Sequence, residues 1–225
     1  MTPPMLRRPE PEVMDLLAEA KAYAETDFSD VNQRFVEWLL ELAGPRETAD
    51  ALDLGTGPGD IPVRLIRLRP KWRVVAVDAS GPMLDFARRL VERAGLRPSI
   101  ELIQADAKAT SLPPQSFDVI FSNSLLHHIT GAAPLWAEIK RLARPGATLL
   151  LRDLARPASP EAAREIVKKY AGDASDLLQE EYYRSLLAAY TPDEVRSQLA
   201  DAGLSSLKVA MVTDRHLDVF GRLNV

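Results

Sequence analysis

Short apolar segments alternate with segments of helical periodicity through the middle of the chain, and this alternation restricts the fold more than any other feature. The expected strands are 49–54, 73–77, 99–103, 117–122 and 147–151, and the helical patterns between them include 61–68, 83–94 and 135–143. Strands that are apolar along their whole length are typical of a parallel sheet covered by helices on both faces. Because parallel strands need crossovers, we expect a helix between each pair. The sequence therefore predicts an α/β fold with a doubly wound sheet.

Helices are also expected before this alternating region. Residues 1–11 are rich in proline and predict a loose arm. From Pro11 onward the apolar residues recur with a helical period, and a second helix follows and stops at Gly44-Pro45. These segments predict an N-terminal helical cap over 12–43.

The segment after the fifth strand is longer than a connection needs. Helical patterns at 161–170 and 174–190 predict a helical insertion, or lid, over 154–190. Aromatic residues gather in this insertion and in the N-terminal cap, and they are Tyr23, Phe28, Tyr170, Tyr182, Tyr183 and Tyr190. We expect most of them to pack on neighbouring elements and one or two to line a ligand pocket.

The end of the chain, 191–225, predicts one more helix and a hairpin. Thr191-Pro192 gives a helix N-cap followed by proline at the first helical position. Strands are expected at 207–213 and 217–222, and their short connection requires an antiparallel pair. We therefore expect a seven-stranded, mostly parallel sheet whose last strand is antiparallel.

Length, charge and composition narrow the class of protein. The 225 residues fit a single domain, and the formal net charge of −4 gives no general attraction to nucleic acid or to an anionic membrane. Apolar runs such as 147–151 are far shorter than the ~18–20 residues of a membrane span. The N-terminus does not resemble a signal peptide, so we expect a cytoplasmic protein. With no cysteine and three histidines, we expect no disulfide and no metal centre.

A glycine-rich loop follows the first expected strand. Glycines at 55, 57 and 59 let the backbone approach a ligand closely, and the next helix points its N-terminus at the loop. A dinucleotide fingerprint would carry Gly or Ala at the sixth position, but Asp60 stands there and Asp53 precedes the loop. Carboxylates at these places disfavour a pyrophosphate. The loop therefore predicts a site for a nucleoside that lacks phosphates.

Polar residues also stand at the ends of the next strands. Asp78 ends the second strand, Asp106 follows the third, and Ser122-Asn123 ends the fourth. The carboxyl ends of parallel strands meet at the edge where open α/β sheets bind their ligands. An acidic residue about 20 positions after the glycine loop is suited to bind ribose hydroxyls, which favours a nucleoside again.

With these motifs the chain resembles the class I S-adenosylmethionine-dependent methyltransferases that act on small molecules. The resemblance covers roughly 48–152, and the helix and hairpin at 191–222 also fit. It rests on the motifs LDLGTGPGD, VVAVDAS followed by Met83, QADA and FDVIFSNSLLHHI. It implies a Rossmann-like fold whose cofactor-binding core is 48–152.

The resemblance also implies which residues hold S-adenosylmethionine. The glycine loop would line the methionine end, with Asp60 near the amino group. Asp78 would hold the ribose, and Asp106 would meet the adenine edge. Ser122 or Asn123 would lie near the sulfonium. The complete implied set is Asp53, Gly55, Thr56, Gly57, Gly59, Asp60, Asp78, Ala79, Met83, Asp106, Ala107, Ser122 and Asn123.

Methyl transfer from a sulfonium is an in-line displacement, so the protein mainly aligns the reactants and, where needed, removes a proton. The candidate catalytic residues are His127 and His128 after the fourth strand and Asp153 at the tip of the fifth. Neighbouring residues of a helical turn point about 100° apart. We therefore expect at most one of the two histidines to face the acceptor.

The acceptor is not identified by the sequence. The segment Asn123-Ser124-Leu125-Leu126 lacks the Asp/Asn-Pro-Pro-Tyr/Phe pattern of many nitrogen methyltransferases, which disfavours nucleobase or glutamine N-methylation. A basic run from Arg64 to Arg73 is interpreted as a solvated helix face. We expect a small-molecule acceptor, no nucleic-acid or membrane partner, and a monomer or homodimer. An RNA or protein methyltransferase and a non-catalytic S-adenosylmethionine-binding protein stay open as alternatives.

Overall fold

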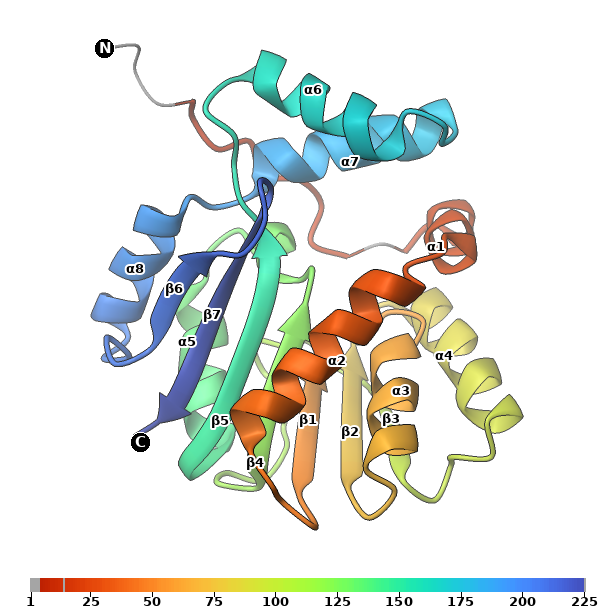
Figure 1. Cartoon of the computed structure of the whole chain (residues 1–225), viewed down its shortest axis with the longest axis vertical. Helices are drawn as coiled ribbons and strands as arrows, with labels where there is room; N and C mark the ends of the chain where they lie inside the picture. The colour runs from red at the N-terminus through yellow and green to blue at the C-terminus, as the bar shows by residue number, and fades with distance from the viewer. Residues whose placement is uncertain (1–4, 14, 225) are drawn as a thin grey trace.

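The computed structural model describes residues 5–13 and 15–224, and a seven-stranded sheet forms its centre (Figure 1). The strand order is β3-β2-β1-β4-β5-β7-β6. The strands are β1 (Asp50–Leu54), β2 (Arg73–Asp78), β3 (Ile100–Gln104), β4 (Phe117–Asn123), β5 (Ala143–Leu154), β6 (Lys208–Met211) and β7 (His216–Leu223). Strands β1 to β5 pair in parallel, and β7 is antiparallel to both β5 and β6. The expected fold class is confirmed.

Helices cover both faces of this sheet. They are α1 (Leu17–Glu25), α2 (Ser29–Ala43), α3 (Asp60–Leu68), α4 (Gly81–Arg93), α5 (Ala133–Leu142), α6 (Pro160–Ala171), α7 (Asp176–Ala188) and α8 (Pro192–Asp201), with a short 3₁₀ turn η1 (Leu126–His128). Helices α2 and α3 lie in front of the sheet in Figure 1, and α5 lies behind it. None of the helices in the described part of the chain is long and apolar enough to cross a membrane.

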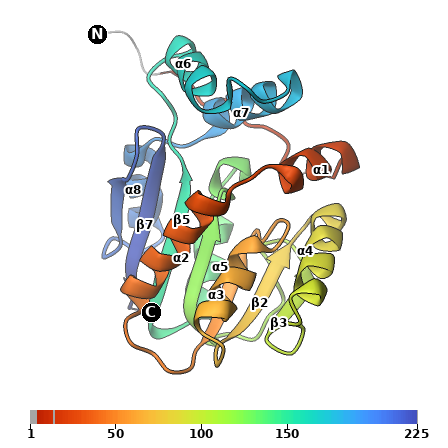
Figure 2. The ribbon, with the colours of Figure 1, turned by 45° about the vertical axis from the view of Figure 1, so that its right-hand side comes forward.

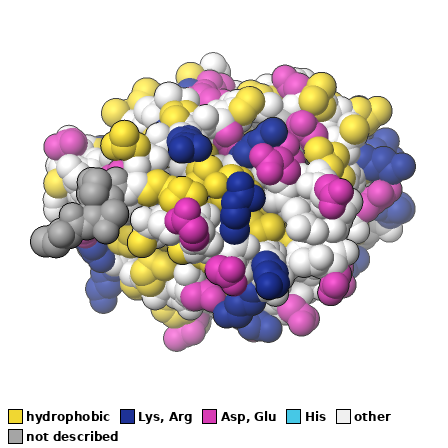
Figure 3. All heavy atoms as spheres, turned by 90° about the horizontal axis from the view of Figure 1, so that it is seen from above, with side chains coloured by type: hydrophobic (Ala, Val, Ile, Leu, Met, Phe, Trp, Pro, Cys, Tyr) yellow, Lys and Arg dark blue, Asp and Glu magenta, His cyan; other side chains and the backbone are white. Residues whose placement is uncertain are grey.

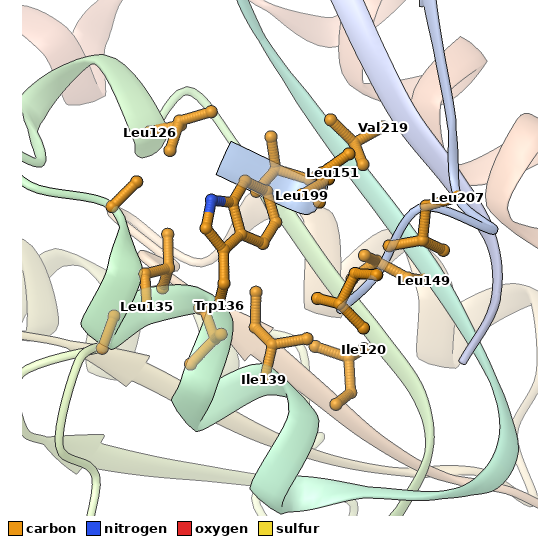
Figure 4. Close-up of a cluster of buried hydrophobic side chains, with 14 of the residues drawn as sticks. Ile120, Leu126, Leu135, Trp136, Ile139, Leu149, Leu151, Leu199, Leu207 and Val219 are labelled. Carbon is orange, nitrogen blue, oxygen red and sulfur yellow. The ribbon is translucent and has the colours of Figure 1, made fainter. Parts of the chain in front are cut away.

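The period of two along a strand explains why consecutive residues in the middle of the central strands are apolar. In β5, Leu150 packs into the core on the α2–α3 face, while Leu149 and Leu151 pack into the core on the other face. Trp136 of α5 is fully buried in this second core and is surrounded by aliphatic side chains of β4, β5, β7 and α8 (Figure 4). Both faces of the strand are buried over 149–151, and all three of these residues are leucines.

Helices α6 and α7 stand above the carboxyl edge of the parallel strands (Figures 1 and 2). They pack on each other through a small core of their own that includes Val167 and Leu186. Side-chain oxygens of Ser159 and Ser175 cap the two helices by accepting hydrogen bonds from backbone N–H groups of the first turns. The insertion therefore forms a roof over the edge where the strands end.

Two expectations about local structure are wrong. The connection from β3 to β4, residues 105–116, contains no helix. Its sequence includes Pro113-Pro114, and prolines at adjacent positions do not continue a helix. The first helix begins at Leu17 rather than at Pro11, so Val13 and Leu16 lie outside it.

The described part of the N-terminal arm is docked and not loose. The backbone N–H of Arg8 donates to the Leu187 carbonyl at 3.0 Å, and the Arg7 side chain donates to the Ala188 carbonyl at 2.5 Å. Because these partners lie about 180 residues away in sequence, only the folded chain brings them to the arm. The remaining residues of the expected arm, 1–4, lie outside the described part.

Candidate functional site

A cavity of about 800 Å³ lies between the carboxyl edge of the sheet and the helices above it. Its wall contains the glycine loop, the ends of β2 and β4, the turn η1, and parts of α1, α2, α6 and α7. Seen from above, hydrophobic side chains gather at the centre of this end of the molecule, with basic and acidic side chains around them (Figure 3). The volume is typical of a pocket for small molecules.

The glycine loop bends away from β1 and leaves space at one position. Gly57 has a φ of +53°, lines the cavity, and would point a Cβ atom at nothing within 4 Å. A Cβ on Gly55 would instead meet Leu125 at 3.0 Å, and one on Gly59 would meet Ala87 of α4 at 3.0 Å. Gly57 is therefore the position where a ligand can approach the backbone, and Gly59 serves the packing of α3 on α4.

Asp53 is a buried carboxylate at the bottom of the cavity. It is 1% exposed and lines the cavity, and its Oδ2 atom has no hydrogen-bond partner in the described chain. Burial raises the pKa of Asp53 to about 7, and the negative charge of Asp78 adds to this shift. An unsatisfied buried carboxylate is costly, which points to a ligand that supplies a positive charge or a hydrogen-bond donor.

Asp78 stands beside the loop with both oxygens positioned by the backbone. Its Oδ2 accepts the N–H of Gly57 at 2.7 Å, and its Oδ1 accepts the N–H of Ser80 at 2.9 Å. Burial raises the pKa of Asp78 as well. Each carboxylate oxygen can accept a second hydrogen bond, so Asp78 can bind a pair of hydroxyl groups. Ala79 and Met83 line the cavity next to it.

The end of β3 adds Asp106 and Ala107 to the cavity wall. Asp106 Oδ1 accepts the N–H of Lys108 at 2.8 Å, and the Lys108 Nζ atom lies 3.1 Å from Asp106 Oδ2. Lys108 Nζ also donates to Glu12 of the arm at 2.8 Å. The turn after β3 is therefore fixed and tied to the arm.

Three of the expected cofactor residues have other roles or partners. Asp60 lines the cavity, but its Oδ2 accepts hydrogen bonds from Arg64 at 2.6 Å and Asn32 at 2.9 Å. Ser122 is buried, does not line the cavity, and donates from its hydroxyl to the Leu54 carbonyl at 2.7 Å. Gly59 likewise does not line the cavity, whereas Thr56 and Asn123 do.

The turn η1 brings two histidines to the cavity wall. His127 Nδ1 lies 2.6 Å from Asp153 Oδ1, and the His127 backbone N–H donates to Asp153 Oδ2 at 3.2 Å. Both histidines line the cavity, whereas Asp153 is 1% exposed and does not. Burial lowers the pKa of His127, but the charge and hydrogen bond of Asp153 outweigh it, and the pKa lies above its usual value. Asp153 therefore orients His127 and cannot touch a substrate.

Glu10 completes this cluster, and sequence reasoning missed it. Its Oε1 atom lies 3.1 Å from His128 Nδ1 and 3.6 Å from His127 Nε2, and its side chain is 8% exposed. The Ser185 hydroxyl of α7 donates to Glu10 Oε1 at 3.1 Å. Nothing in the sequence around Glu10 marks it, because the residue reaches the site through the tertiary docking of a proline-rich arm.

Comparison with known proteins shows which proteins the chain is similar to. The family model described as a methyltransferase domain matches residues 51–146. The ubiquinone/menaquinone biosynthesis C-methyltransferase UbiE of Hahella chejuensis is 28% identical over 194 residues, which cover 81% of this chain and 78% of the relative. Residues 51–146 therefore match a methyltransferase domain, and the chain is similar to S-adenosylmethionine-dependent methyltransferases of the class I fold.

Other relatives and solved structures agree with this assignment. The trans-aconitate 2-methyltransferase of Azoarcus sp. is 34% identical over 125 residues, which cover 56% of this chain and 47% of the relative, so the match spans about half of that protein. A SAM-dependent methyltransferase from Aquifex aeolicus has the same fold, with a TM-score of 0.69 at 23% identity over 92% of this chain and 98% of that one. Phosphoethanolamine N-methyltransferase 2 of Haemonchus contortus, solved with S-adenosylmethionine, gives a TM-score of 0.68 at 19% identity, over 88% of this chain and 44% of that one.

The upper part of the methyltransferase cavity is aromatic and partly basic. Tyr23, Phe28, Tyr170 and Tyr182 line it, while Tyr183 and Tyr190 do not. Arg215 lies 3.3 Å above the centre of the Tyr170 ring. Arg152 of β5 is paired with Asp218 through two hydrogen bonds of 2.7 Å, so the carboxylate of Asp218 already balances its charge.

Proposed function

We propose that this methyltransferase transfers the methyl group of S-adenosylmethionine to a small molecule held between η1 and the α6–α7 roof. One observation carries the proposal: a single cavity joins the glycine loop and the strand-end carboxylates to the paired histidines. The names of the relatives UbiE and trans-aconitate 2-methyltransferase describe small-molecule acceptors. We also propose that 48–152 forms the cofactor half of a single domain. The acceptor half would then combine 12–43 with 154–190.

The cofactor half fits S-adenosylmethionine residue by residue. The open space at Gly57 admits the methionine part, and the unsatisfied carboxylate of Asp53 faces a ligand that carries two positive charges. The free lone pairs of Asp78 suit the ribose hydroxyls, and Asp106 with Ala107 suits the adenine edge. Asp60 Oδ2 already accepts hydrogen bonds from Arg64 and Asn32, so the amino group would bind to another residue.

The acceptor half would position the nucleophile for an in-line displacement. S-adenosylmethionine supplies an electrophilic methyl group on a sulfonium. Alignment of the reacting atoms contributes up to about 7–11 kcal/mol to such a step, and the roof formed by α6 and α7 excludes water from it. We propose that His127, held by Asp153, and His128 prepare the acceptor's nucleophilic atom.

Transfer to RNA or protein receives less support from the structure. Two cations of the basic run have partners, because Arg64 Nε lies 2.6 Å from Asp60 Oδ2 and Lys71 Nζ lies 2.5 Å from Glu47 Oε1. The roof over the cavity also favours a small acceptor over a polymer. A non-catalytic binding protein would not need histidines at the junction of the two halves.

The first experiment measures binding of S-adenosylmethionine and S-adenosylhomocysteine by calorimetry, followed by transfer of labelled methyl to pooled metabolites, RNA and protein. We expect micromolar binding and label in the metabolite pool. Asp78→Ala should weaken cofactor binding at least 100-fold, because two ribose hydrogen bonds to a charged group are lost. Asp85→Ala, which removes an exposed carboxylate of α4 paired with Arg88, is the matched control.

The outcomes separate the alternatives. His128→Ala should abolish transfer and leave cofactor affinity within about threefold, because the residue serves the acceptor. Label in RNA or protein would overturn the small-molecule proposal. Tight cofactor binding without transfer to any pool would favour the non-catalytic alternative, and binding of neither compound would contradict the proposed site as a whole.

A further inference from the structure

We propose that Glu10, His127 and His128 form a binding site for a divalent transition-metal ion, with Zn²⁺ as the best match. One carboxylate and two imidazoles are a donor set that zinc uses in catalytic sites, where three protein ligands leave a fourth position open. The proposal concerns a second ligand of the protein, next to the methyl-donor site. It replaces the expectation from the sequence that the chain holds no metal centre.

The distances fit the size of such a site. Glu10 Oε1 lies 3.1 Å from His128 Nδ1 and 3.6 Å from His127 Nε2. Zinc–ligand bonds of ~2.0–2.1 Å in a tetrahedron place neighbouring ligand atoms about 3.3–3.4 Å apart. The three donor atoms all lie within 4.8 Å of one another, so closing around one ion requires only small side-chain shifts.

The residues behind the donors support the same interpretation. Asp153 Oδ1 lies 2.6 Å from His127 Nδ1 and fixes the ring. In the tautomer with the proton on Nδ1, the Nε2 lone pair is on the side of Glu10, whose Oε1 lies 3.6 Å away. The Ser185 hydroxyl holds Glu10 at 3.1 Å. Metal-binding histidines almost always donate their second N–H to a carboxylate, a carbonyl or water, and binding carboxylates are themselves hydrogen-bonded. Both features are present here.

Charge compensation gives a third argument. Glu10 and Asp153 bring two negative charges into a site where their side chains are 8% and 1% exposed. Buried charges need a partner, and the nearby Arg7 guanidinium donates to the carbonyls of His127 and Ile129 instead. A divalent cation would balance both carboxylates with neutral histidines. The rival account is a protonated His127 between two carboxylates with no metal.

The open coordination position indicates the class of acceptor, and this step rests on the proposed function. His127 and His128 line the cavity, so a fourth ligand would come from the acceptor side. An acceptor oxygen bound there would lose its proton to solvent more easily, as metal-bound water does. It would then attack the methyl carbon, so that the new C–O bond forms while the C–S bond of S-adenosylmethionine breaks and S-adenosylhomocysteine leaves. The acceptor would be a hydroxyl, enol or carboxyl compound.

The test uses the full chain after dialysis against a chelator. Calorimetry with Zn²⁺ should give one ion per chain with a Kd of about 1 μM or tighter, and Co²⁺ should give the visible absorption of a four-coordinate site. Glu10→Gln and His128→Ala should each weaken Zn²⁺ binding at least tenfold. The control Glu47→Gln alters an exposed carboxylate that pairs with Lys71, and it should leave the affinity for Zn²⁺ unchanged.

Several results would overturn the metal site. These are a Kd for Zn²⁺ weaker than about 1 mM, or equal Zn²⁺ binding in the parent chain, Glu10→Gln and His128→Ala. Methyl transfer that continues in a metal-free chain would show that the ion is not needed and leave the proposed function intact. Binding of one Zn²⁺ ion per chain without methyl transfer would support the metal site and contradict the proposed function.

Discussion

Asp53 shows at the scale of one residue how a binding site is maintained at the expense of stability. Its carboxylate is buried at the end of β1 and one oxygen has no hydrogen-bond partner in the described chain. Burial raises its pKa to about 7 from an ordinary value of 3.8. Between these two values the folded state holds a proton that the unfolded state has lost. Without bound cofactor, the free energy of unfolding therefore falls as the pH rises from about 4 to 7.

The variant Asp53→Asn tests this directly. The amide cannot ionise, so we expect the free energy of unfolding at pH 8 to rise by about 1–3 kcal/mol and the melting temperature by roughly 3–10 °C. At pH 4 the two proteins should be nearly equal. Thermal unfolding across this pH range measures the difference, and Asp85→Asn is the exposed control.

The same substitution should weaken S-adenosylmethionine binding, because the cationic ligand favours the ionised carboxylate. A stabilised variant with unchanged cofactor affinity would contradict the role given to Asp53. An unchanged melting temperature at pH 8 would contradict the raised pKa.

At the scale of elements, the N-terminal arm couples the roof to the histidine turn. The Arg7 guanidinium donates to carbonyls of α7 and of the η1 region and lies 4.0 Å above the Tyr190 ring. Glu12 accepts the Thr130 N–H at 2.7 Å. The arm therefore carries Glu10 to the histidines as part of an ordered connection between α7 and η1.

Removing the Arg7 side chain should loosen this element without unfolding the protein. Charged hydrogen bonds contribute about 1.5–3 kcal/mol each, so Arg7→Ala should increase opening of the arm at least tenfold. Hydrogen exchange over residues 5–13 and limited proteolysis before Leu17 measure the opening. Arg8→Ala is the matched control, because Arg8 holds the arm through its backbone N–H. Equal exchange in both variants would show that Arg7 does not hold the arm.

The expected elements were largely right where local pattern decides them. The glycine loop, the strand before it and the Thr191 cap, whose oxygen accepts the Glu194 N–H, stand where the sequence places them. The expected loose arm, the helix from Pro11 and the helix in the connection 105–116 are wrong. Prolines and contacts with residues distant in sequence decide the structure of these segments, and neither helical periodicity nor the rule of one helix per crossover accounts for them.

At the scale of the whole molecule, the last strand joins the parallel part of the sheet to the terminal hairpin. Strand β7 pairs antiparallel with β5 on one side and β6 on the other. Arg152 of β5 binds Asp218 of β7 through two hydrogen bonds of 2.7 Å, and Asp218 is fully buried. The pair therefore ties two regions that are distant in sequence into one sheet.

Breaking this pair should destabilise the entire domain. Asp218→Ala leaves a mostly buried guanidinium without its carboxylate, which costs about 3–5 kcal/mol. Denaturant unfolding should show one transition at a lower midpoint, because the sheet unfolds as a unit. Asp193→Ala removes the exposed partner of Arg196 and should cost no more than about 1 kcal/mol. A loss of less than 1 kcal/mol for Asp218→Ala would contradict this account.

The sequence by itself determined the parallel sheet, the glycine loop and the carboxylates at the strand ends. These features depend on residues that are close in sequence, where periodicity and the φ preferences of glycine act directly. The tertiary structure alone decided that Glu10 meets His127 and His128, that Asp153 orients His127 without touching the cavity, and that Ser122 joins two strands. Each of these contacts links side chains from separate elements. The burial that shifts their pKa values and leaves Asp53 without a partner exists only once those elements have packed.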